Sequence, residues 1–587
     1  MTDLAASEVE VDLEAVRELY RREREKRIHP EGSAQYRRMS DELAHFVDDP
    51  YTERIERAPV HDQVEVAVIG GGFGGLLLGA RMRQIGVDDL RIVEQGGDFG
   101  GTWYWNRYPG AACDTESYIY LPLLEEVGYI PTEKYVKGPE IFEHCRRIAR
   151  HFDLYQNALL QTKVTDVRWS ETDELWTITT DRGDAFRAKY VCMTTGAMVK
   201  PKLPGVPGIE TFKGHAFHTT RWDYEYTGGS PAGGLTGLAD KKVAIVGTGA
   251  TGIQAIPHVA ASAGHTYVVQ RTPSSINVRA NRPTDPEWVK TLRPGWQRER
   301  MTNFSLFVAG GEVETDLVND GWTAIYRLRT LNGGVLDERL DYLKMEEIRA
   351  RVDSVVKDPA TAANLKPYYR ALCKRPCFHD EYLDAFNRPN VTLLDTNGKG
   401  LEEVTRNGIV VEGKEYPVDC IIFASGFQIG GPLARKLGYD VTGRDGVALS
   451  EKWKNGISTF YGMQTRGFPN FFVVATAQVG VSSNQAHVLD VQSRHIAYVI
   501  NEARTRDAST VDVEQQAEDA WVQTVIDASR ADLEFLASCT PGYYNNEGNP
   551  IIEIFRRNGA YSPGIVAFDD IVTEWRESGL NDGLEFN

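Results

Sequence analysis

Hydrophobic and polar residues follow the same order at two places in the chain. In QVEVAVIGGGFGGLLLGARMRQIGVDDLRIVEQGG, an apolar run at 66–69 leads into glycines, a longer apolar stretch and a second short run at 90–93. Short apolar runs on either side of a glycine turn and a helix-length stretch are typical of a strand–helix–strand unit. The order recurs between Lys241 and Pro273, in KKVAIVGTGATGIQAIPHVAASAGHTYVVQRTP. The pattern predicts an α/β fold with two Rossmann-like dinucleotide-binding domains.

Two segments lack this alternation and are rich in helix-forming residues. Residues 1–60 are highly charged, with Val16, Leu19 and Tyr20 on one face of a predicted helix. We expect a helical extension packed on the main body, and a partly disordered tail is the alternative, because charge runs usually lie in solvent. Residues 281–365 predict a helical insertion. The predicted domains are the N-terminal extension 1–60, a first nucleotide domain at 61–197 and 420–587, and a second at 198–419 that includes the insertion.

The bulk composition disfavours several classes of protein. Hydrophobic residues make up 42% and charged residues 25% of the 587 residues, the balance of a globular protein with a large core. A formal net charge of -18 argues against general affinity for nucleic acid or anionic membranes. No apolar run approaches the roughly 20 residues of a membrane helix, and the N-terminus is acidic where a secretory signal is basic. We therefore expect a cytoplasmic protein without nucleic-acid or membrane partners, and the sequence does not set its oligomeric state.

Seven cysteines are scattered along the chain, an odd number without a CxxC pair. This pattern indicates reduced thiols in a reducing compartment. Cys373 and Cys377 lie four residues apart, but no other residues of ligand type lie close to them in the sequence, so we interpret them as ordinary thiols. No metal site is predicted.

The first glycine turn has the features of a dinucleotide site. Gly70, Gly72 and Gly75 follow a strand and open a helix, where glycines permit a tight turn, close approach of a pyrophosphate and helix–strand packing. The amides at the start of such a helix attract phosphate. Glu94 ends the second strand, nineteen residues beyond Gly75, where an acid binds a ribose hydroxyl. We assign this site, with Phe73 beside it, to FAD.

The second turn repeats this geometry at Gly247, Gly249 and Gly252, but Gln270 and Arg271 replace the acid. A guanidinium at this place attracts the 2′-phosphate of NADPH, whereas a carboxylate repels it. The pattern therefore favours NADPH over NADH, and a surface arginine without a ligand is the alternative. The other turn residues assigned to this site are Thr248, Ala250 and Thr251.

An aromatic segment follows the first site. GGTWYWNRYPGAACD, residues 100–114, is too aromatic for a solvated loop. Trp103, Tyr104, Trp105 and Tyr108 could be plain core residues, which is the usual role of an aromatic cluster. The segment ends in Asp114, whose burial would require a cationic partner.

The segment between the two turns carries a further pattern. FKGHAFHTTRWD places Phe212, Gly214, His218, Trp222 and Asp223 at the spacing FxGxxxHxxxW followed by an acid. This pattern resembles the fingerprint of the type I Baeyer–Villiger monooxygenases, class B flavoprotein monooxygenases that insert an oxygen atom beside a ketone carbonyl. The aromatic segment is similar to their second signature. With both glycine turns, the resemblance extends from about residue 64 to the C-terminus.

The resemblance implies an activity and its cofactors. Members of the family use FAD, NADPH and O2 to convert ketones into esters or lactones through a peroxyflavin. In the family the fingerprint is a hinge between the nucleotide domains, so we expect His218 to act through domain positioning rather than proton transfer. The form of residues 537–548 is similar to the branch that oxidises bulky and large-ring ketones, such as cyclopentadecanone and steroids.

The resemblance also assigns roles to single residues. In CKRPC, Lys374 would join Arg271 at the 2′-phosphate, and Arg375 would be the catalytic cation that stabilises the peroxide and the oxyanion of its ketone adduct. Asp114 would hold Arg375 in place and compensate its burial. The residues expected around FAD by family position are Thr102, Trp103, Tyr104, Trp105, Tyr120 and Val164.

Three alternative functions fit less well. A flavin enzyme that oxygenates nitrogen or sulfur shares the cofactors and is the closest alternative. A pyridine nucleotide–disulfide reductase needs a redox cysteine pair after the first glycine turn, and none is present. A nucleotide sensor without turnover would have lost Arg375 or Asp114, and both are present.

Overall fold

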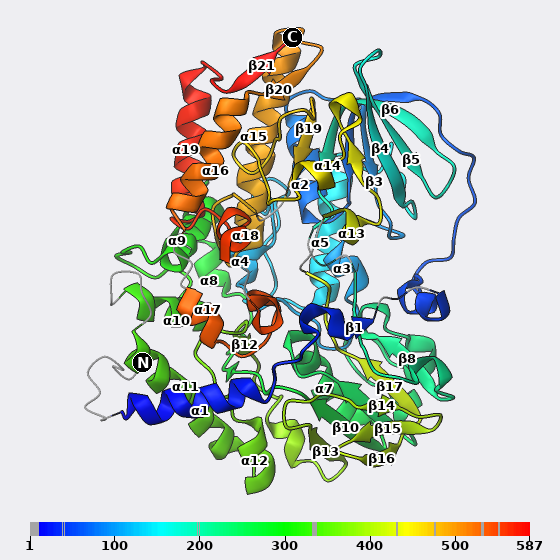
Figure 1. The fold of residues 1–587 in the computed structure, drawn as a ribbon, viewed down its shortest axis with the longest axis vertical. Helices are drawn as coiled ribbons and strands as arrows, with labels where there is room; N and C mark the ends of the chain where they lie inside the picture. Colours follow the sequence, from blue (N-terminus) through cyan, green and yellow to red (C-terminus); the bar gives the residue numbers. More distant parts are fainter. Residues whose placement is uncertain are drawn as a thin grey trace.

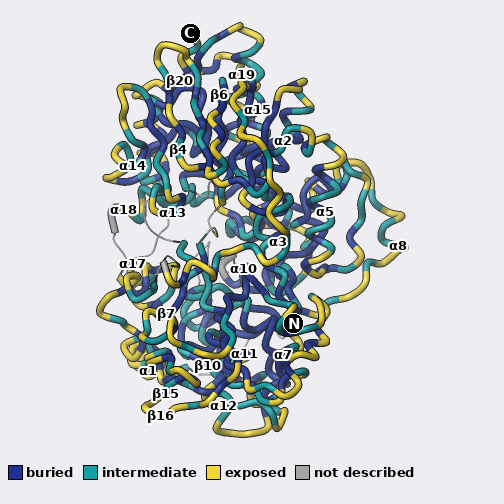
Figure 2. The backbone as a smooth tube through the Cα atoms, turned by 90° about the vertical axis from the view of Figure 1, so that its right-hand side faces the viewer, coloured by how far each residue is buried: buried dark blue, intermediate teal, exposed yellow. Residues whose placement is uncertain are grey.

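The structure is a computed structural model that describes residues 11–37, 39, 41–196, 198, 200–330, 337–429, 433–474, 477–529, 533–549 and 552–587. The chain forms two lobes, each built around a β-sheet with helices packed outside it (Figure 1). The buried parts of the backbone lie inside both lobes, and exposed positions follow the peripheral loops (Figure 2). Among the described residues, no helix is both long enough and apolar enough to cross a membrane.

The first sheet has seven strands in the order β18–β4–β5–β6–β2–β3, with β19 paired to β6. Its central strands are buried on both faces, which explains the continuous apolar run of β2. The parallel part consists of β2 (Gln63–Ile69), β3 (Leu90–Val93), β6 (Ala185–Met193) and β19 (Phe471–Val473). Strands β4 (Val164–Ser170) and β5 (Leu175–Thr180) pair antiparallel with each other, and β5 also pairs antiparallel with β6. Strand β18 (Val441–Thr442) pairs parallel with β4 at the edge of the sheet.

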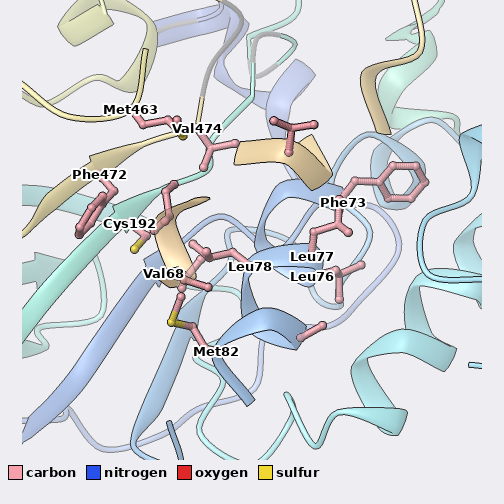
Figure 3. Packing of buried hydrophobic residues seen from close by; sticks show 14 of the residues in the cluster. Val68, Phe73, Leu76, Leu77, Leu78, Met82, Cys192, Met463, Phe472 and Val474 are labelled. Carbon is pink, nitrogen blue, oxygen red and sulfur yellow. The ribbon is translucent and has the colours of Figure 1, made fainter. Parts of the chain in front are cut away.

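Helix α2 (Phe73–Gln84) follows the first glycine turn and is buried along almost its whole length. It has apolar residues on all sides because it packs between the first sheet and α15 (Gln485–Thr505). Leu76 and Leu78 of α2 lie in one cluster with Val68 of the sheet and Val474 (Figure 3). This packing fixes the start of α2, and so the glycine turn, relative to the sheet.

The second sheet is fully parallel and has the strand order β13–β10–β9–β17–β8. Helix α7 (Ala250–Ser262) connects β9 to β10, as the sequence pattern predicts. The strands are β8 (His215–His218), β9 (Lys242–Val246), β10 (His265–Gln270), β13 (Val391–Asp395) and β17 (Cys420–Phe423).

The insertion and the N-terminal extension both contain helices in the described ranges, and the extension also has the short strand β1 (Tyr36–Arg37). Tyr20 of α1 (Leu13–Glu25) accepts a hydrogen bond of 3.0 Å from Arg349 Nη1, and α1 runs beside α11 (Figure 1). The extension therefore packs on the main body from Leu13 onward, and residues 1–10 lie outside the described residues. The fold class predicted from the sequence is confirmed. The helices of the insertion are α8 (Pro286–Val289), α9 (Trp296–Ala309), α10 (Gly321–Thr330), α11 (Glu338–Val355) and α12 (Pro359–Leu365).

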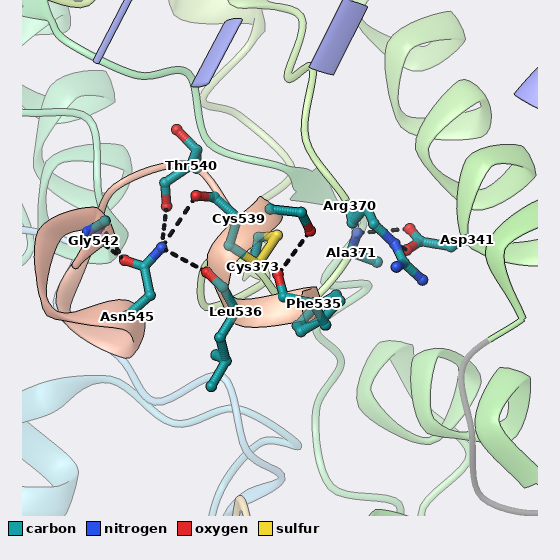
Figure 4. The surroundings of a disulfide bond; sticks show 12 residues. Asp341, Arg370, Ala371, Cys373, Phe535, Leu536, Cys539, Thr540, Gly542 and Asn545 are labelled. Atoms are coloured by element: carbon teal, nitrogen blue, oxygen red, sulfur yellow. Dashed lines mark hydrogen bonds and ion pairs between the residues drawn. A yellow bond between two sulfur atoms is a disulfide. The ribbon is translucent and has the colours of Figure 1, made fainter. Parts of the chain in front are cut away.

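A disulfide joins Cys373 to Cys539, 166 residues away in the sequence (Figure 4). The expectation that all seven thiols are reduced was therefore wrong for these two, whereas the other five cysteines are free. Such a pair is set by which loops the fold brings together, so spacing along the chain gives no signal for it. The bond attaches the segment after α17 (Leu533–Ser538) to the chain just before Lys374 and Arg375.

Candidate active site

The first glycine turn leads into the start of a helix that has no side-chain cap. A Cβ on Gly75 would lie 1.9 Å from the carbonyl oxygen of Gly70, and one on Gly70, where φ is +114°, would lie 2.8 Å from that of Thr194. Helix α2 begins after Gly72, which offers no capping side chain, so its first amides keep donors for a ligand. A diphosphate such as that of FAD fits this end of the helix.

Glu94 follows β3 and is buried, with 5% of its surface exposed. Its carboxylate accepts hydrogen bonds of 2.6 Å from the amides of Gly71 and Gly96. Burial raises the pKa of Glu94, and these amide bonds oppose that rise. Each of the two oxygens accepts from one amide, so about one further acceptor site remains on each oxygen for a ribose hydroxyl. The side chain therefore holds the glycine turn as well as facing the place predicted for FAD.

The second turn has the same build, with one informative difference. A Cβ on Gly252 would lie 2.2 Å from the carbonyl oxygen of Gly247, whereas one on Gly249 would meet no atom within 4 Å. Fold packing therefore requires Gly252, while the space at Gly249 is open for a ligand. Helix α7 starts there without a side-chain cap, which fits a second dinucleotide.

Positive side chains gather beyond this second turn. Arg271 follows β10, and its Nη2 lies 3.3 Å from a carboxylate oxygen of Glu547. The other oxygen of Glu547 lies 3.6 Å from Lys202 Nζ. Burial and the nearby charges of Arg271 and Arg27 together lower the pKa of Lys374 to about 8, so Lys374 lies close to Arg271 and belongs to the same cluster. Gln270 does not join it, because its Nε2 donates 2.8 Å to the carbonyl of Asn364 inside the fold.

The aromatic residues after the first site divide into two groups. Trp103 donates from Nε1 to the hydroxyl of Tyr120 at 3.1 Å, and the ring of Phe73 lies 5.3 Å from that of Tyr120. These three rings lie together at the start of α2. The hydroxyl of Tyr104 instead contacts Asp49 and Thr52 of the N-terminal extension.

Three further residues expected around FAD occupy different positions. Thr102 begins the short helix α3 (Thr102–Trp105), which directly follows Gly101. Trp105 lies under the guanidinium of Arg221, whose carbon is 3.6 Å from the ring centroid. The side chain of Val164 is buried in the hydrophobic cluster of the first sheet.

The aromatic segment also contacts the second nucleotide unit. Tyr108 donates 2.8 Å to Oε1 of Gln254, a residue of α7, and Gln254 Nε2 donates 2.9 Å to the carbonyl of Ala112. The hydroxyl and the amide are fully buried, so these bonds hold the two lobes in one relative position. Sequence reasoning did not single out Gln254.

Asp114 is the centre of a buried charge triad. Its Oδ2 accepts 2.7 Å from Arg375 Nη1, and its Oδ1 accepts from Arg279 Nη2. Asp114 is 3% exposed, whereas the side chain of Arg375 keeps 31% of its surface exposed. The guanidinium carbon of Arg375 lies 5.5 Å from the ring centroid of Trp322, whose Nε1 donates 3.1 Å to the carbonyl of Asp114. The triad carries two positive charges and one negative charge, with Arg375 as its accessible member.

The charges of the triad set each other's protonation. Burial alone would raise the pKa of Asp114, but the charges of Arg279 and Arg375 outweigh it and lower this pKa. Burial would lower the pKa of Arg375, and Asp114 more than reverses this effect and raises it well above the usual value. Asp114 stays an anion and Arg375 a cation at every working pH.

His218 of the fingerprint is buried in the junction between the lobes. Its Nδ1 accepts 3.2 Å from the amide of Thr220, and its ring lies 6.2 Å from that of Phe427. Burial and the charge of Arg221 lower the pKa of His218 to about 3. A neutral, enclosed imidazole of this kind fits a positioning role.

The other fingerprint residues are explained by packing. A Cβ on Gly214 would lie 2.4 Å from the ring of Phe212 and 2.5 Å from the carbonyl oxygen of Asp419. Trp222 is fully buried, and its amide donates 2.9 Å to the hydroxyl of Tyr51 from the extension. Asp223 caps the helix that follows and accepts 2.9 Å from His215.

Several residues at this site escaped sequence reasoning. Arg279 is 165 residues from Asp114, and nothing distinguishes it from the other 64 lysines and arginines in the sequence. Trp322 lies in a segment without a motif, and the similarity of residues 537–548 to the family does not point to Glu547. Asp114 is the one signal in the sequence for Arg279. A buried carboxylate needs cationic partners, so Asp114 indicates that a second cation lies beside it.

Comparison with known proteins finds similar chains over nearly the whole length. Residues 67–304 match the family model described as pyridine nucleotide-disulphide oxidoreductase. Neopentalenolactone D synthase from Streptomyces avermitilis is 52% identical over 97% of this chain and 98% of its own. A Baeyer-Villiger monooxygenase from Streptomyces coelicolor is 49% identical over 97% of each chain. The solved polycyclic ketone monooxygenase from the fungus Thermothelomyces thermophila has a TM-score of 0.93 and 38% identity, covering 98% of this chain and 99% of its own.

Proposed function

Because this chain belongs to the Baeyer–Villiger monooxygenases, we propose that it oxygenates a bulky, polycyclic ketone and that Arg375 is its catalytic cation. The enzyme is a flavoprotein that uses NADPH and O2 to convert a ketone into an ester or lactone. This is the activity expected from the sequence, and the similar chains favour it over oxygenation of nitrogen or sulfur.

Both cofactors have a matching place in this chain. FAD and NADP are bound in solved structures of the same fold. The turn at Gly70 and the carboxylate of Glu94 would hold FAD, and the turn at Gly247 with Arg271 and Lys374 would hold NADPH. When bound, NADPH supplies the hydride and FAD the chemistry with O2. The chain supplies binding, orientation and charge.

Arg375 is suited to stabilising negative charge that develops on the substrate oxygen. A guanidinium does not lose its proton, and its charge is present before the reaction begins. A preorganised donor of this kind lowers the barrier by about 3 to 4 kcal/mol. The exposed third of its side chain is the part free to meet a ligand.

Asp114 acts as a positioning residue in this proposal. It fixes one nitrogen of Arg375 at 2.7 Å and leaves the other nitrogens of the fork available. Without this carboxylate, Arg279 and Arg375 would repel each other at close range in a buried place. His218 takes no part in proton transfer here, because its imidazole stays neutral and enclosed.

The proposed substrate size rests on similarity. The polycyclic ketone monooxygenase matches 98% of this chain, and a ketocytochalasin monooxygenase from Aspergillus clavatus is 40% identical. Both names describe large ketones.

We also propose that the domain limits follow the sheets, with 1–60 as the extension. Since β17 pairs with β9, the second domain extends through Phe423 before the chain returns to the first.

The test is product analysis with the FAD-loaded enzyme. NADPH and air are supplied with a small cyclic, a large-ring and a polycyclic ketone, and ester formation is compared with hydrogen peroxide release. We expect esters from the polycyclic ketone with little peroxide. Oxidation of amines or sulfides in place of every ketone would contradict the proposed substrate class, as would a preference for the small ketone.

A further inference from the structure

Glu547 is a buried carboxylate placed among cations that the reaction needs. It is 4% exposed and lies in a short 3-10 helix, Tyr543–Gly548. One of its oxygens is 3.3 Å from Arg271 Nη2, and the other is 3.6 Å from Lys202 Nζ. The same oxygen that faces Lys202 accepts 3.2 Å from the hydroxyl of Tyr36. Glu547 thus reaches the second nucleotide site from the far end of the chain.

The cluster around Glu547 has more positive than negative charge. Arg271, Lys202 and Lys374 contribute three cations against this one carboxylate. Burial and the neighbouring Arg271 lower the pKa of Lys202 to about 8, although Glu547 opposes this change. A phosphate dianion would neutralise the cluster better than a carboxylate does, because it carries up to two charges and more acceptor oxygens.

We propose that Glu547 is an internal anion that occupies the place of the 2′-phosphate and must be displaced when NADPH binds. This rests on the proposed assignment of Arg271 to NADPH. Glu547 thereby reduces the preference of the enzyme for the phosphorylated coenzyme. It weakens the binding of a 2′-phosphorylated coenzyme by competing for the same cations, and it leaves a coenzyme without that phosphate little affected.

The backbone at Glu547 has a conformation that favours its displacement. Asn546 and Glu547 have φ values of +51° and +55°, in the left-handed region that is unfavourable for residues with a Cβ. A displacement that lets the backbone leave this conformation relieves its strain. Arg24 adds a weaker tie, donating 3.3 Å to the carbonyl of Gly548.

The segment cannot move far once released. Cys539 is joined to Cys373, the neighbour of Lys374, so seven residues separate Glu547 from a fixed point beside the site. The side chain of Asn545 also ties the segment together, donating to the carbonyls of Leu536, Cys539 and Thr540 (Figure 4). A short tether keeps the carboxylate at high effective concentration, which makes it an effective competitor and allows it to return.

A purely structural ion pair predicts the opposite behaviour. If Glu547 only shaped the site, its removal would leave Arg271 misplaced and weaken binding of the phosphorylated ligand. If Glu547 competes, its removal strengthens that binding. The two roles therefore differ in the direction of one measured change.

The experiment measures affinity without turnover, by calorimetric titration of 2′,5′-ADP and 5′-AMP into the FAD-loaded protein. The variants are Glu547→Gln, Arg271→Ala and, as a matched control, Glu210→Gln. Glu210 pairs with Arg37 at 2.7 Å and so also joins the extension to the second lobe. We expect Glu547→Gln to lower the Kd for 2′,5′-ADP about tenfold, which corresponds to about 1.4 kcal/mol. The Kd for 5′-AMP should change less than twofold, and Glu210→Gln should change neither.

The outcomes separate this inference from the assignment beneath it. An unchanged or higher Kd for 2′,5′-ADP in Glu547→Gln, with weaker binding in Arg271→Ala, overturns the role of Glu547 alone. Unchanged binding in Arg271→Ala overturns the NADPH site and the inference with it. Hydrogen exchange of residues 542–548 in the unaltered protein gives a check without substitution. We expect 2′,5′-ADP to speed this exchange and 5′-AMP not to, and equal exchange with both ligands refutes displacement.

Discussion

Replacement of Arg279 tests whether the net charge of the triad matters for catalysis. Arg279 and Arg375 both bind the carboxylate of Asp114, so the triad has a net charge of one positive unit. In Arg279→Met the pair between Asp114 and Arg375 remains, and its charges cancel. We expect Arg375 to stay in place while its ability to stabilise an anion decreases.

The size of this effect follows from the distances. Both guanidinium groups lie within hydrogen-bond reach of one carboxylate, so an oxygen on the open side of Arg375 is about 7 Å from the Arg279 charge. At an effective dielectric constant of about 20, that charge stabilises an anion by about 2.4 kcal/mol, or a factor of roughly 50 in rate. Solvent screening removes little of this, because the side chain of Arg279 is only 5% exposed. The loss of its hydrogen bond to Asp114 affects stability by a comparable amount, about 1.5 to 3 kcal/mol.

The assay compares ester formation and thermal unfolding for Arg279→Met and Arg279→Lys. We expect the methionine variant to form ester roughly 50-fold more slowly at saturating ketone, with the ketone KM within about threefold. Lysine keeps the charge and should restore most of the rate, within about fivefold. A methionine variant that forms ester at the unaltered rate would refute the argument from net charge. Failure of lysine to restore any activity would show that the shape of Arg279 matters instead.

Three further predictions concern other parts of the molecule. Reduction of the Cys373–Cys539 bond by dithiothreitol should lower the free energy of unfolding by about 3 to 5 kcal/mol, because the closed loop is long. Thermal melts of the Cys373→Ser/Cys539→Ser double variant should match those of the reduced protein and not those of the oxidised protein. Gly249→Ala should have the melting temperature of the unaltered protein but bind NADP+ at least tenfold more weakly. Gly252→Ala should be destabilised, because its Cβ would lie 2.2 Å from a carbonyl oxygen. Equal melting temperatures for the two variants would contradict this. Five buried histidines have pKa values lowered by burial to about 3 or 4, below the unfolded value of about 6.5, so their contribution to stability is complete above pH 6.5 and is lost as the pH falls. Denaturant unfolding at pH 7.5 and 5.5 should show a decrease of about 1.4 kcal/mol per histidine, and equal stability at both values would be inconsistent with neutral burial. These histidines are His144, His218, His379, His487 and His495.

The sequence was sufficient where local geometry dictates residue type. Gly75 and Gly252 are required because a side chain at either would overlap the carbonyl oxygen of the glycine five residues earlier. The spacing of the glycines reflects this constraint. Gly214 and Trp222 are explained in the same way by close packing at the junction of the lobes. The spacing of such residues therefore predicts both nucleotide turns and the junction.

The sequence was insufficient where distant segments meet. Arg279 and Glu547 owe their positions to the tertiary fold, and the partner of Cys373 lies 166 residues away. Gln270 and Arg271 were assigned together, but Gln270 ends a buried strand and donates to the carbonyl of Asn364 in α12. Arg271 lies past the end of the strand and contacts Glu547. Tyr104 lies in an aromatic segment of the kind expected to line a flavin site. Its hydroxyl instead contacts Asp49 and Thr52 of the N-terminal extension. No pattern within a short window contains this information.

The most direct test of Arg375 as the catalytic cation is the ratio of ester formed to NADPH consumed by Arg375→Ala with a polycyclic ketone. We predict that the variant still binds FAD and oxidises NADPH but forms ester at least a hundredfold more slowly, so that the consumed NADPH appears as hydrogen peroxide. An unchanged ratio of ester to NADPH at an undiminished rate would contradict the assignment.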